Sequence, residues 1–134
     1  MAGKLDSALG YYENALRLRS QRQQILASNI ANADTPGFKA RDFDFNKAMQ
    51  SAMSQTQDAN SLPLVKTNPV HLSSQSIVEN PSVFFRKPTQ NNLDDNTVDM
   101  DVERNAFAEN AMRYESDVAM AHHDIKELLS VLQG

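Results

Sequence analysis

The chain has 134 residues, enough for one modest domain, and a net charge of −4. This charge argues against nucleic acid as the main partner, because phosphate-binding proteins carry clustered Lys and Arg with a basic balance. The absence of cysteine excludes disulfides, thiolate zinc sites and cysteine nucleophiles. No apolar run approaches the roughly 20 residues of a membrane span. The first residues lack the apolar stretch of a cleavable signal peptide, so we expect any export to use a route that does not read one.

A heptad seam that begins at Leu5 predicts a long N-terminal helix, because apolar residues recur in alternating steps of four and three. Arg19 and Gln23 are the two polar interruptions of this seam. Its eight positions are Leu5, Leu9, Tyr12, Leu16, Arg19, Gln23, Leu26 and Ile30.

The same helix carries a second apolar stripe, well round from the first, at Tyr11, Leu18 and Ile25. A helix that is apolar on two sides usually has neighbours on two sides. The pattern leaves two alternatives open: another copy of the chain covers this stripe, or the middle of the chain does so in a small bundle.

The helix is predicted to end near Ala33, just before a chain reversal. Thr35 precedes proline, which disfavours the helical conformation. Pro36 suits position i+1 of a type II turn, and Gly37 supplies the positive φ required at i+2. Phe38 is then expected to return to apolar surface.

Asn29 and Asn32 lie one turn apart immediately upstream of this stop. Each amide offers two donors and one acceptor oxygen. We expect them to satisfy carbonyls freed at the helix end and backbone groups of the returning loop, as a polar clasp that fixes the helix end, the turn and the next subunit in one register. The alternative is an ordinary helix C-terminus with solvated amides.

A short amphipathic helix is predicted at about 45–54, with Asp44 as its N-cap. Its apolar residues follow the spacing i, i+3, i+4, i+7, i+8, which is typical of packing. They are Phe45, Ala48, Met49, Ala52 and Met53.

Residues 56–96 are predicted to be an irregular or mobile linking segment rich in Pro, Asn and Ser. Two short extended pieces are expected, at Leu62–Val65 and Val83–Arg86, neither long enough to define a sheet. The segment has no glycine and holds four of the five prolines: Pro63, Pro69, Pro81 and Pro88.

A second long helix is predicted for residues 97–134, with Thr97 or Asp99 as the N-cap and carboxylates in its first turn. Its seam is Phe107, Ala111, Tyr114, Val118, Ala121, Ile125, Leu128 and Leu132. The predicted fold is therefore mainly α. Long helices at 1–34 and 97–134 pair as a coiled-coil-like hairpin, and the turn and short helix at 35–55 precede the irregular segment 56–96.

No constellation of catalytic or metal-ligating residues emerges from the sequence. His122 and His123 are adjacent on a helix, so their side chains point about 100° apart, and His71 stands alone. An EF-hand fails, because Arg104 stands where glycine is needed and Asn110 where glutamate is needed. We therefore expect no enzyme activity, no metal, no cofactor and no small-molecule substrate.

The stretch LASNIANADTPGFKARDFDF, Leu26–Phe45, resembles the N-terminal signature of flagellar axial proteins: an Asn-x-x-Asn pair followed by Thr-Pro-Gly-aromatic. The segments NTVDMDVERNAFAENAMRYE and LLSVLQG resemble the rod proteins of that family, and TNPVHL (Thr67–Leu72) does so loosely. Asp95 departs from the family pattern, since glycine is usual there, which puts a tight turn in doubt. Phe38 is a mild departure, because tyrosine is also common.

The resemblance implies a structural subunit of the proximal rod of the bacterial flagellar basal body. Such subunits assemble with their own copies and other proximal rod proteins into a tubular drive shaft that transmits torque and forms the export channel. The implied further partners are the adapter between export gate and rod and the flagellar type III export apparatus. The implied location is the periplasm-spanning rod, reached without a cleaved signal peptide. The axial motif would be Asn29, Asn32, Thr35, Pro36, Gly37 and Phe38.

Two apolar faces per helix suit such an array, so Tyr11, Leu18 and Ile25 are expected to contact a neighbouring subunit. We also expect the isolated monomer to be only marginally ordered at its ends. The alternative function is a soluble coiled-coil adapter or export chaperone of a type III secretion system.

Overall fold

The computed structural model describes residues 2–58, 81–88 and 92–134, and its fold is mainly α, as predicted. The predicted extended piece Leu62–Val65, the segment Thr67–Leu72 and His71 lie outside these residues. None of the described helices is long and apolar enough to cross a membrane. The elements in chain order are α1 (Ala2–Ala31), β1 (Arg41–Phe43), α2 (Phe45–Asp58), β2 (Val83–Phe85) and α3 (Met100–Gln133).

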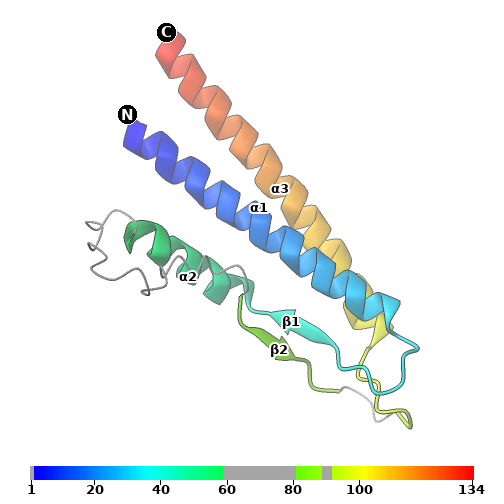
Figure 1. Ribbon diagram of the computed structural model, residues 1–134. Coiled ribbons are helices and arrows are strands. Elements are labelled where there is room, and N and C mark those ends of the chain that lie inside the picture. The colour runs from blue at the N-terminus through cyan, green and yellow to red at the C-terminus, as the bar shows by residue number, and fades with distance from the viewer. Residues whose placement is uncertain (1, 59–80, 89–91) are drawn as a thin grey trace, which may run out of the picture.

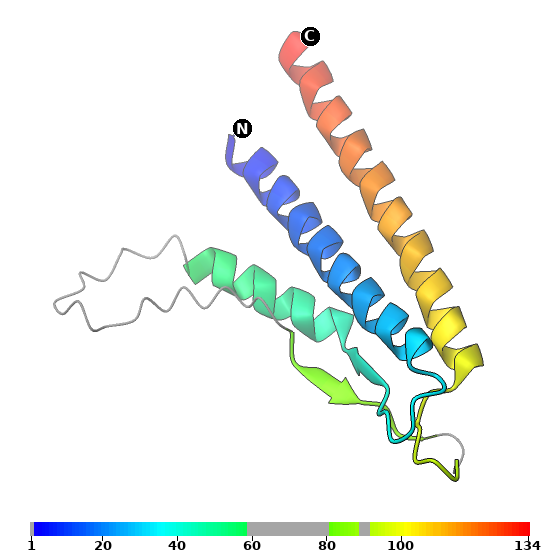
Figure 2. The same ribbon diagram turned by 45° about the vertical axis from the view of Figure 1, so that its right-hand side comes forward.

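The long helices α1 and α3 form the predicted hairpin (Figure 1). They run in opposite directions, and both chain ends lie at the same end of the molecule. Figure 2 shows that the two helices diverge toward that end, while α2 packs along α1 on the side away from α3. The hairpin is therefore closed where α1 ends and α3 begins, and open where the chain starts and finishes.

The reversal after α1 has the predicted turn. The helix ends at Ala31, two residues before the expected position, and the N–H of Phe38 donates to the carbonyl of Thr35 at 3.2 Å. Gly37 has a φ of +74°. This left-handed conformation is one that glycine adopts without a steric penalty, as the type II turn required.

Helix α2 covers most of the second apolar stripe of α1. This corrects the expectation that the stripe contacts a neighbouring subunit. Leu18 is only 1% exposed and packs with residues of β1 and α2, and Ile25 packs against the same cluster. Tyr11 alone remains about half exposed, at 46%. The bundle closed by the middle of the chain is thus the correct alternative, because β1 and α2 supply the residues that bury Leu18. The buried cluster is Ala15, Leu18, Phe43, Ala48, Met49 and Ala52.

A small sheet also corrects the sequence analysis. The strand β2 falls within the expected extended piece, but it pairs with β1, which was not predicted. The pairing is antiparallel, with Asp42 opposite Phe84.

The helix α2 begins at Phe45 as expected and continues to Asp58, and Asp44 caps it by accepting from the N–H of Lys47 at 3.2 Å.

The cap of α3 is Asp99, one of the two residues predicted for this position, and its carboxylate accepts from the N–H groups of Asp101 and Val102.

The predicted apolar seam of α3 is only partly covered by α1. Four of its residues are at least one third exposed: Tyr114 (39%), Val118 (44%), Ile125 (37%) and Leu132 (71%). An apolar stripe therefore remains open toward the free end of the hairpin.

Candidate functional site

Asn29 is the centre of a polar network at the closed end of the hairpin. Its side chain is fully buried, and its amide nitrogen donates to the carbonyl of Arg41 at 2.7 Å and to the Glu103 carboxylate at 3.0 Å. Its amide oxygen accepts from the N–H of Arg41 at 3.0 Å. One side chain thus joins α1 to the start of β1 and to α3.

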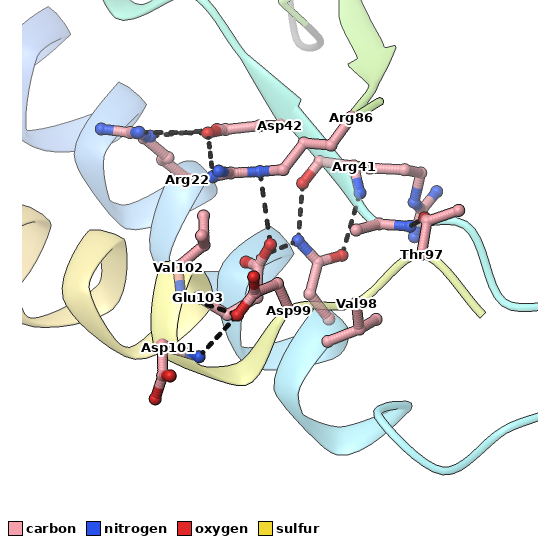
Figure 3. Close-up of polar contacts among 12 residues, drawn as sticks. Arg22, Arg41, Asp42, Arg86, Thr97, Val98, Asp99, Asp101, Val102 and Glu103 are labelled. Atoms are coloured by element: carbon pink, nitrogen blue, oxygen red, sulfur yellow. Dashed lines mark hydrogen bonds and ion pairs between the residues drawn. The ribbon is translucent and has the colours of Figure 1, made fainter. Parts of the chain in front are cut away.

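The network continues from Glu103 through alternating charges (Figure 3). The carboxylate of Glu103 lies 3.3 Å from Nε of Arg86, an ion pair without hydrogen-bond alignment. Arg86 also pairs with Asp42 at 2.6 Å. Asp42 accepts two further bonds from Arg22, at 3.0 and 3.1 Å. We call these five side chains, Asn29, Glu103, Arg86, Asp42 and Arg22, the clasp.

The clasp is electrically balanced, since two guanidinium groups face two carboxylates in a mostly buried setting. The hydrogen bond from Arg22 to Asp42 raises the pKa of Arg22, although its partial burial opposes this shift. Buried ions cost several kcal/mol each to desolvate and are stable only when paired and hydrogen-bonded. Each carboxylate of the clasp is paired with an arginine. The clasp is therefore suited to a structural role.

Asn29 and Asn32, which the sequence pairs, have different roles in the structure. Asn32 is partly buried, and its side chain donates to the carbonyl of Ser28 at 2.8 Å and accepts from the hydroxyl of Thr35 at 3.1 Å. These contacts are local to the helix end. The predicted clasp is therefore centred on Asn29, with Asn32 shaping the turn.

Asn96 was missed by the sequence analysis, although it opens the NTVDMDV run. It is 2% exposed, and its amide nitrogen donates to the carbonyls of Asn32, Ala33 and Thr35 at 2.9–3.0 Å. Its amide oxygen accepts from the N–H of Val98 at 2.8 Å. Asn96 thus satisfies carbonyls of the turn that follows α1 and joins this turn to the start of α3.

The loops at 32–40 and 92–99 are joined further by backbone contacts. The N–H of Gly37 donates to the carbonyl of Asp94 at 2.7 Å, and the N–H of Thr97 donates to the carbonyl of Phe38 at 3.0 Å. The N–H of Ala40 donates to the hydroxyl of Thr97 at 2.8 Å. The Thr-Pro-Gly-Phe turn therefore forms one unit with the start of α3, immediately beside the clasp.

Replacing Asp95 by glycine is expected to stabilise the protein by about 0.5–1 kcal/mol. Asp95 keeps the tight turn that the departure from the family pattern put in doubt, but it does so at a φ of +58°. This left-handed backbone is strained for a residue with a Cβ. Thermal unfolding of Asp95→Gly, compared with Asp94→Gly at an exposed neighbour, measures the effect. A lower melting temperature for Asp95→Gly contradicts the prediction.

Polar contacts also continue along the hairpin above the clasp. Nε of Arg19 donates to Asp117 at 2.6 Å, while its guanidinium stacks on the ring of Phe45 at 3.9 Å. Further out, the hydroxyl of Tyr12 donates to Asp124 at 2.8 Å. The interface of α1 with α3 therefore carries charged and hydrogen-bonded pairs beside its apolar residues.

The Tyr12 contact predicts a pH dependence. The hydrogen bond to Asp124 raises the pKa of Tyr12 above its ordinary value of 10.0. Because the folded pKa is the higher one, the contact stabilises fully below the unfolded pKa and is lost as pH rises through the folded pKa. Subtracting the tyrosinate absorbance titration of Tyr12→Phe from that of the parent isolates this group. Asp124→Asn is expected to lower the midpoint, and an unchanged midpoint contradicts the contact.

One group of potential metal ligands lies elsewhere, on the outer part of α3. Ligand atoms of His123, Asp124 and Glu127 lie within 4.8 Å of one another, and two of these residues are exposed. Asp124 already accepts from Tyr12. This group is separate from the clasp.

Comparison with known proteins places the site in context. Residues 12–39, which include Asn29 and the Thr-Pro-Gly-Phe turn, match a family model described as flagella basal body rod protein. Over 135 residues the chain is 46% identical to the flagellar basal body rod protein FlgB of Yersinia ruckeri, covering 99% of this chain and 98% of that protein. It is 44% identical to FlgB of Escherichia coli strain K12, covering 100% and 99%. It is 43% identical to FlgB of Salmonella typhimurium, also covering 100% and 99%.

Proposed function

Because the chain belongs to the family of flagellar basal body rod proteins, we propose that the clasp holds the terminal helices in the arrangement from which the rod is built. The chain is a structural subunit of the flagellar basal body rod. In our proposal it occupies the proximal rod. Residues 1–34 and 97–134 supply the axial helices of a tubular shaft that transmits torque and encloses the export channel.

The observation that carries this proposal is the open apolar stripe of α3. Tyr114, Val118, Ile125 and Leu132 remain 37–71% exposed on one helix. Contiguous apolar surface of this kind marks an interface with another protein. A contact of one surface with a different surface on the next copy builds open tubes and filaments. We therefore propose the exposed stripe of α3, in place of the second stripe of α1, as the inter-subunit surface.

The proposed partners are other copies of the chain, other proximal rod proteins, and the adapter between export gate and rod. The chain would reach the rod through the flagellar type III export apparatus without cleavage of a signal peptide. The family is structural and is not a family of enzymes, and we propose that this chain has no catalytic role.

Substitution on the stripe tests the proposal. Val118→Asp places a charge on the exposed stripe, whereas Ser116→Asp places one on another exposed side of the same helix. Both purified variants should keep the parent's melting temperature within about 2 °C, since both sites are exposed. In a strain lacking the native gene, only Val118→Asp should lose swimming and incorporation into isolated basal bodies. Normal swimming by Val118→Asp would overturn the role of the stripe.

Fractionation separates this function from the alternative of a coiled-coil adapter or export chaperone. A rod subunit should be recovered with detergent-washed basal bodies. A chaperone should remain in the soluble cytoplasmic fraction, bound to one client. Recovery only in the soluble fraction would contradict the rod proposal.

A further inference from the structure

Asn110 is a polar residue in the middle of the hairpin interface. Its side chain is fully buried, and its amide nitrogen donates to the carbonyl of Arg19 at 2.9 Å and to the side-chain oxygen of Gln23 at 2.7 Å. Its own amide oxygen has no hydrogen-bond partner within the described residues. A buried acceptor without a partner costs about 1–3 kcal/mol, so Asn110 lowers the stability of the hairpin relative to an apolar residue.

The polar side chain of Asn110 belongs to a regular series on α3. Glu103, Asn110, Asp117 and Asp124 are seven residues apart, and each makes a polar contact with α1. Seven-residue spacing keeps side chains on one face of a helix. The face of α3 turned to α1 is therefore marked by polar groups, while its apolar stripe lies beside them.

The partners of Asn110 and Asp117 on α1 are the two residues that interrupt its apolar seam, Arg19 and Gln23. In the observed register Gln23 meets Asn110, and Arg19 meets Asp117. These four residues therefore combine the two polar positions of the α1 seam with two members of the polar series on α3. We call them the register key.

If α3 shifted along α1 by one heptad, the polar groups of the register key would no longer meet. Seven residues along α1 from Gln23 lie Leu16 and Ile30, so Asn110 would be buried against an apolar side chain. Burial of an amide without hydrogen bonds costs more than the observed half-satisfied state.

The same slip affects the ion pair of the key. Asp117 would lie beside Tyr12 or Leu26 and would lose Arg19, and the loss of this partly buried ion pair is destabilising. An apolar seam alone would tolerate such a slip, because its residues repeat at the same interval.

We propose that the register key, Arg19, Gln23, Asn110 and Asp117, specifies the register and rotation of α3 on α1 at a cost in stability. With the key in place, α3 turns its polar series toward α1 and its apolar stripe outward. That the outward stripe meets a neighbouring subunit rests on the proposed function. The specification of register does not, and it is testable on the purified chain.

The test replaces the amide pair of the key by apolar residues of similar shape, in the double variant Gln23→Leu/Asn110→Leu. A hollow of about 250 Å³ lined by Gln23 and Asn110 gives the new side chains room. Variant and control both also carry Asp117→Asn and Asn29→Ala, because the Arg19–Asp117 ion pair and the Asn29–Glu103 contact oppose the same slip. The matched control is Gln24→Leu/Asn105→Leu, which makes the same exchanges at exposed positions of the same helices.

Register is read with paired cysteines, since the chain has none of its own. Tyr12→Cys with Asp124→Cys reports the observed register, because these side chains touch. Tyr12→Cys with Val131→Cys and Leu5→Cys with Asp124→Cys report slips of one heptad in the two directions. Cross-linking of each pair by a short bismaleimide is quantified in dilute protein.

In the variant that lacks the Gln23–Asn110 amide pair, we expect cross-linking at one of the two slipped pairs to rise roughly fivefold over the control. Its melting temperature should equal or exceed that of the control, because an unpaired buried acceptor is removed. Cross-linking confined to the observed pair overturns the proposal. A melting temperature more than about 5 °C below that of the control, or failure to fold where the control folds, also overturns it, since Asn110 would then supply stability.

Discussion

Replacing Asn29 by alanine is expected to lower the free energy of unfolding by about 3 kcal/mol or more, because each buried polar group left unpaired costs about 1–3 kcal/mol. The substitution removes three hydrogen bonds at once, two to the backbone of Arg41 and one to Glu103. Asn29 and Glu103 are both fully buried, so water does not replace the amide there at low cost. Chemical denaturation with circular dichroism measures the loss.

Asn32→Ala is the matched control for this experiment, since it removes the same amide one helical turn away. Its contacts are local to the helix end, and only about 1 kcal/mol should be lost. Swimming in a strain that lacks the native gene should fail for Asn29→Ala and persist for Asn32→Ala. Equal losses of stability for the two variants would contradict the central position given to Asn29.

Replacing Asp42 by alanine should cost about 3–5 kcal/mol, the range measured when one partner of a buried ion pair is removed. Its carboxylate is 7% exposed and is shared by Arg22 and Arg86. Without it two guanidinium groups face each other beside a single remaining carboxylate, that of Glu103. Repulsion between them should detach β2 from β1, and limited proteolysis in the region of Val83–Phe85 should accelerate.

The control for Asp42→Ala is Glu109→Ala. Glu109 forms an exposed ion pair with Arg113 on α3, where both side chains are more than half accessible to water. Exposed pairs of this kind contribute about 0.3–0.5 kcal/mol. A loss for Asp42→Ala no larger than that for Glu109→Ala would show that the clasp charges are solvated and would contradict the account.

The helices were predictable because their signals are local. The heptad repeats, the cap at Asp99 and the stop at Pro36 and Gly37 all lie within a few residues of the elements that they define. The short helix after Asp44 followed from its apolar spacing in the same way. Its docking partner did not, since the apolar face of α2 fits several surfaces, and only the folded chain shows that it covers Leu18.

The clasp was only partly predictable because its members come from distant parts of the chain. The sequence indicated Asn29 through its position at the helix end, but Glu103 is 74 residues away and looks like an ordinary first-turn carboxylate. Asp42 and Arg86 become partners only once β1 pairs with β2. A three-residue strand has no periodicity that a sequence pattern can reveal.

Amide hydrogen exchange on the dilute monomer tests the central claim most directly. That claim is that the chain itself secures the closed end of the hairpin, while its open end needs neighbours. Local stability follows the density of buried contacts, so we expect strong protection in residues 15–30 and 100–112. Protection should be much weaker in residues 3–12 and 118–133, and should rise there in assembled rods. Uniformly strong protection of α3 through to Gln133 in the monomer would contradict the account.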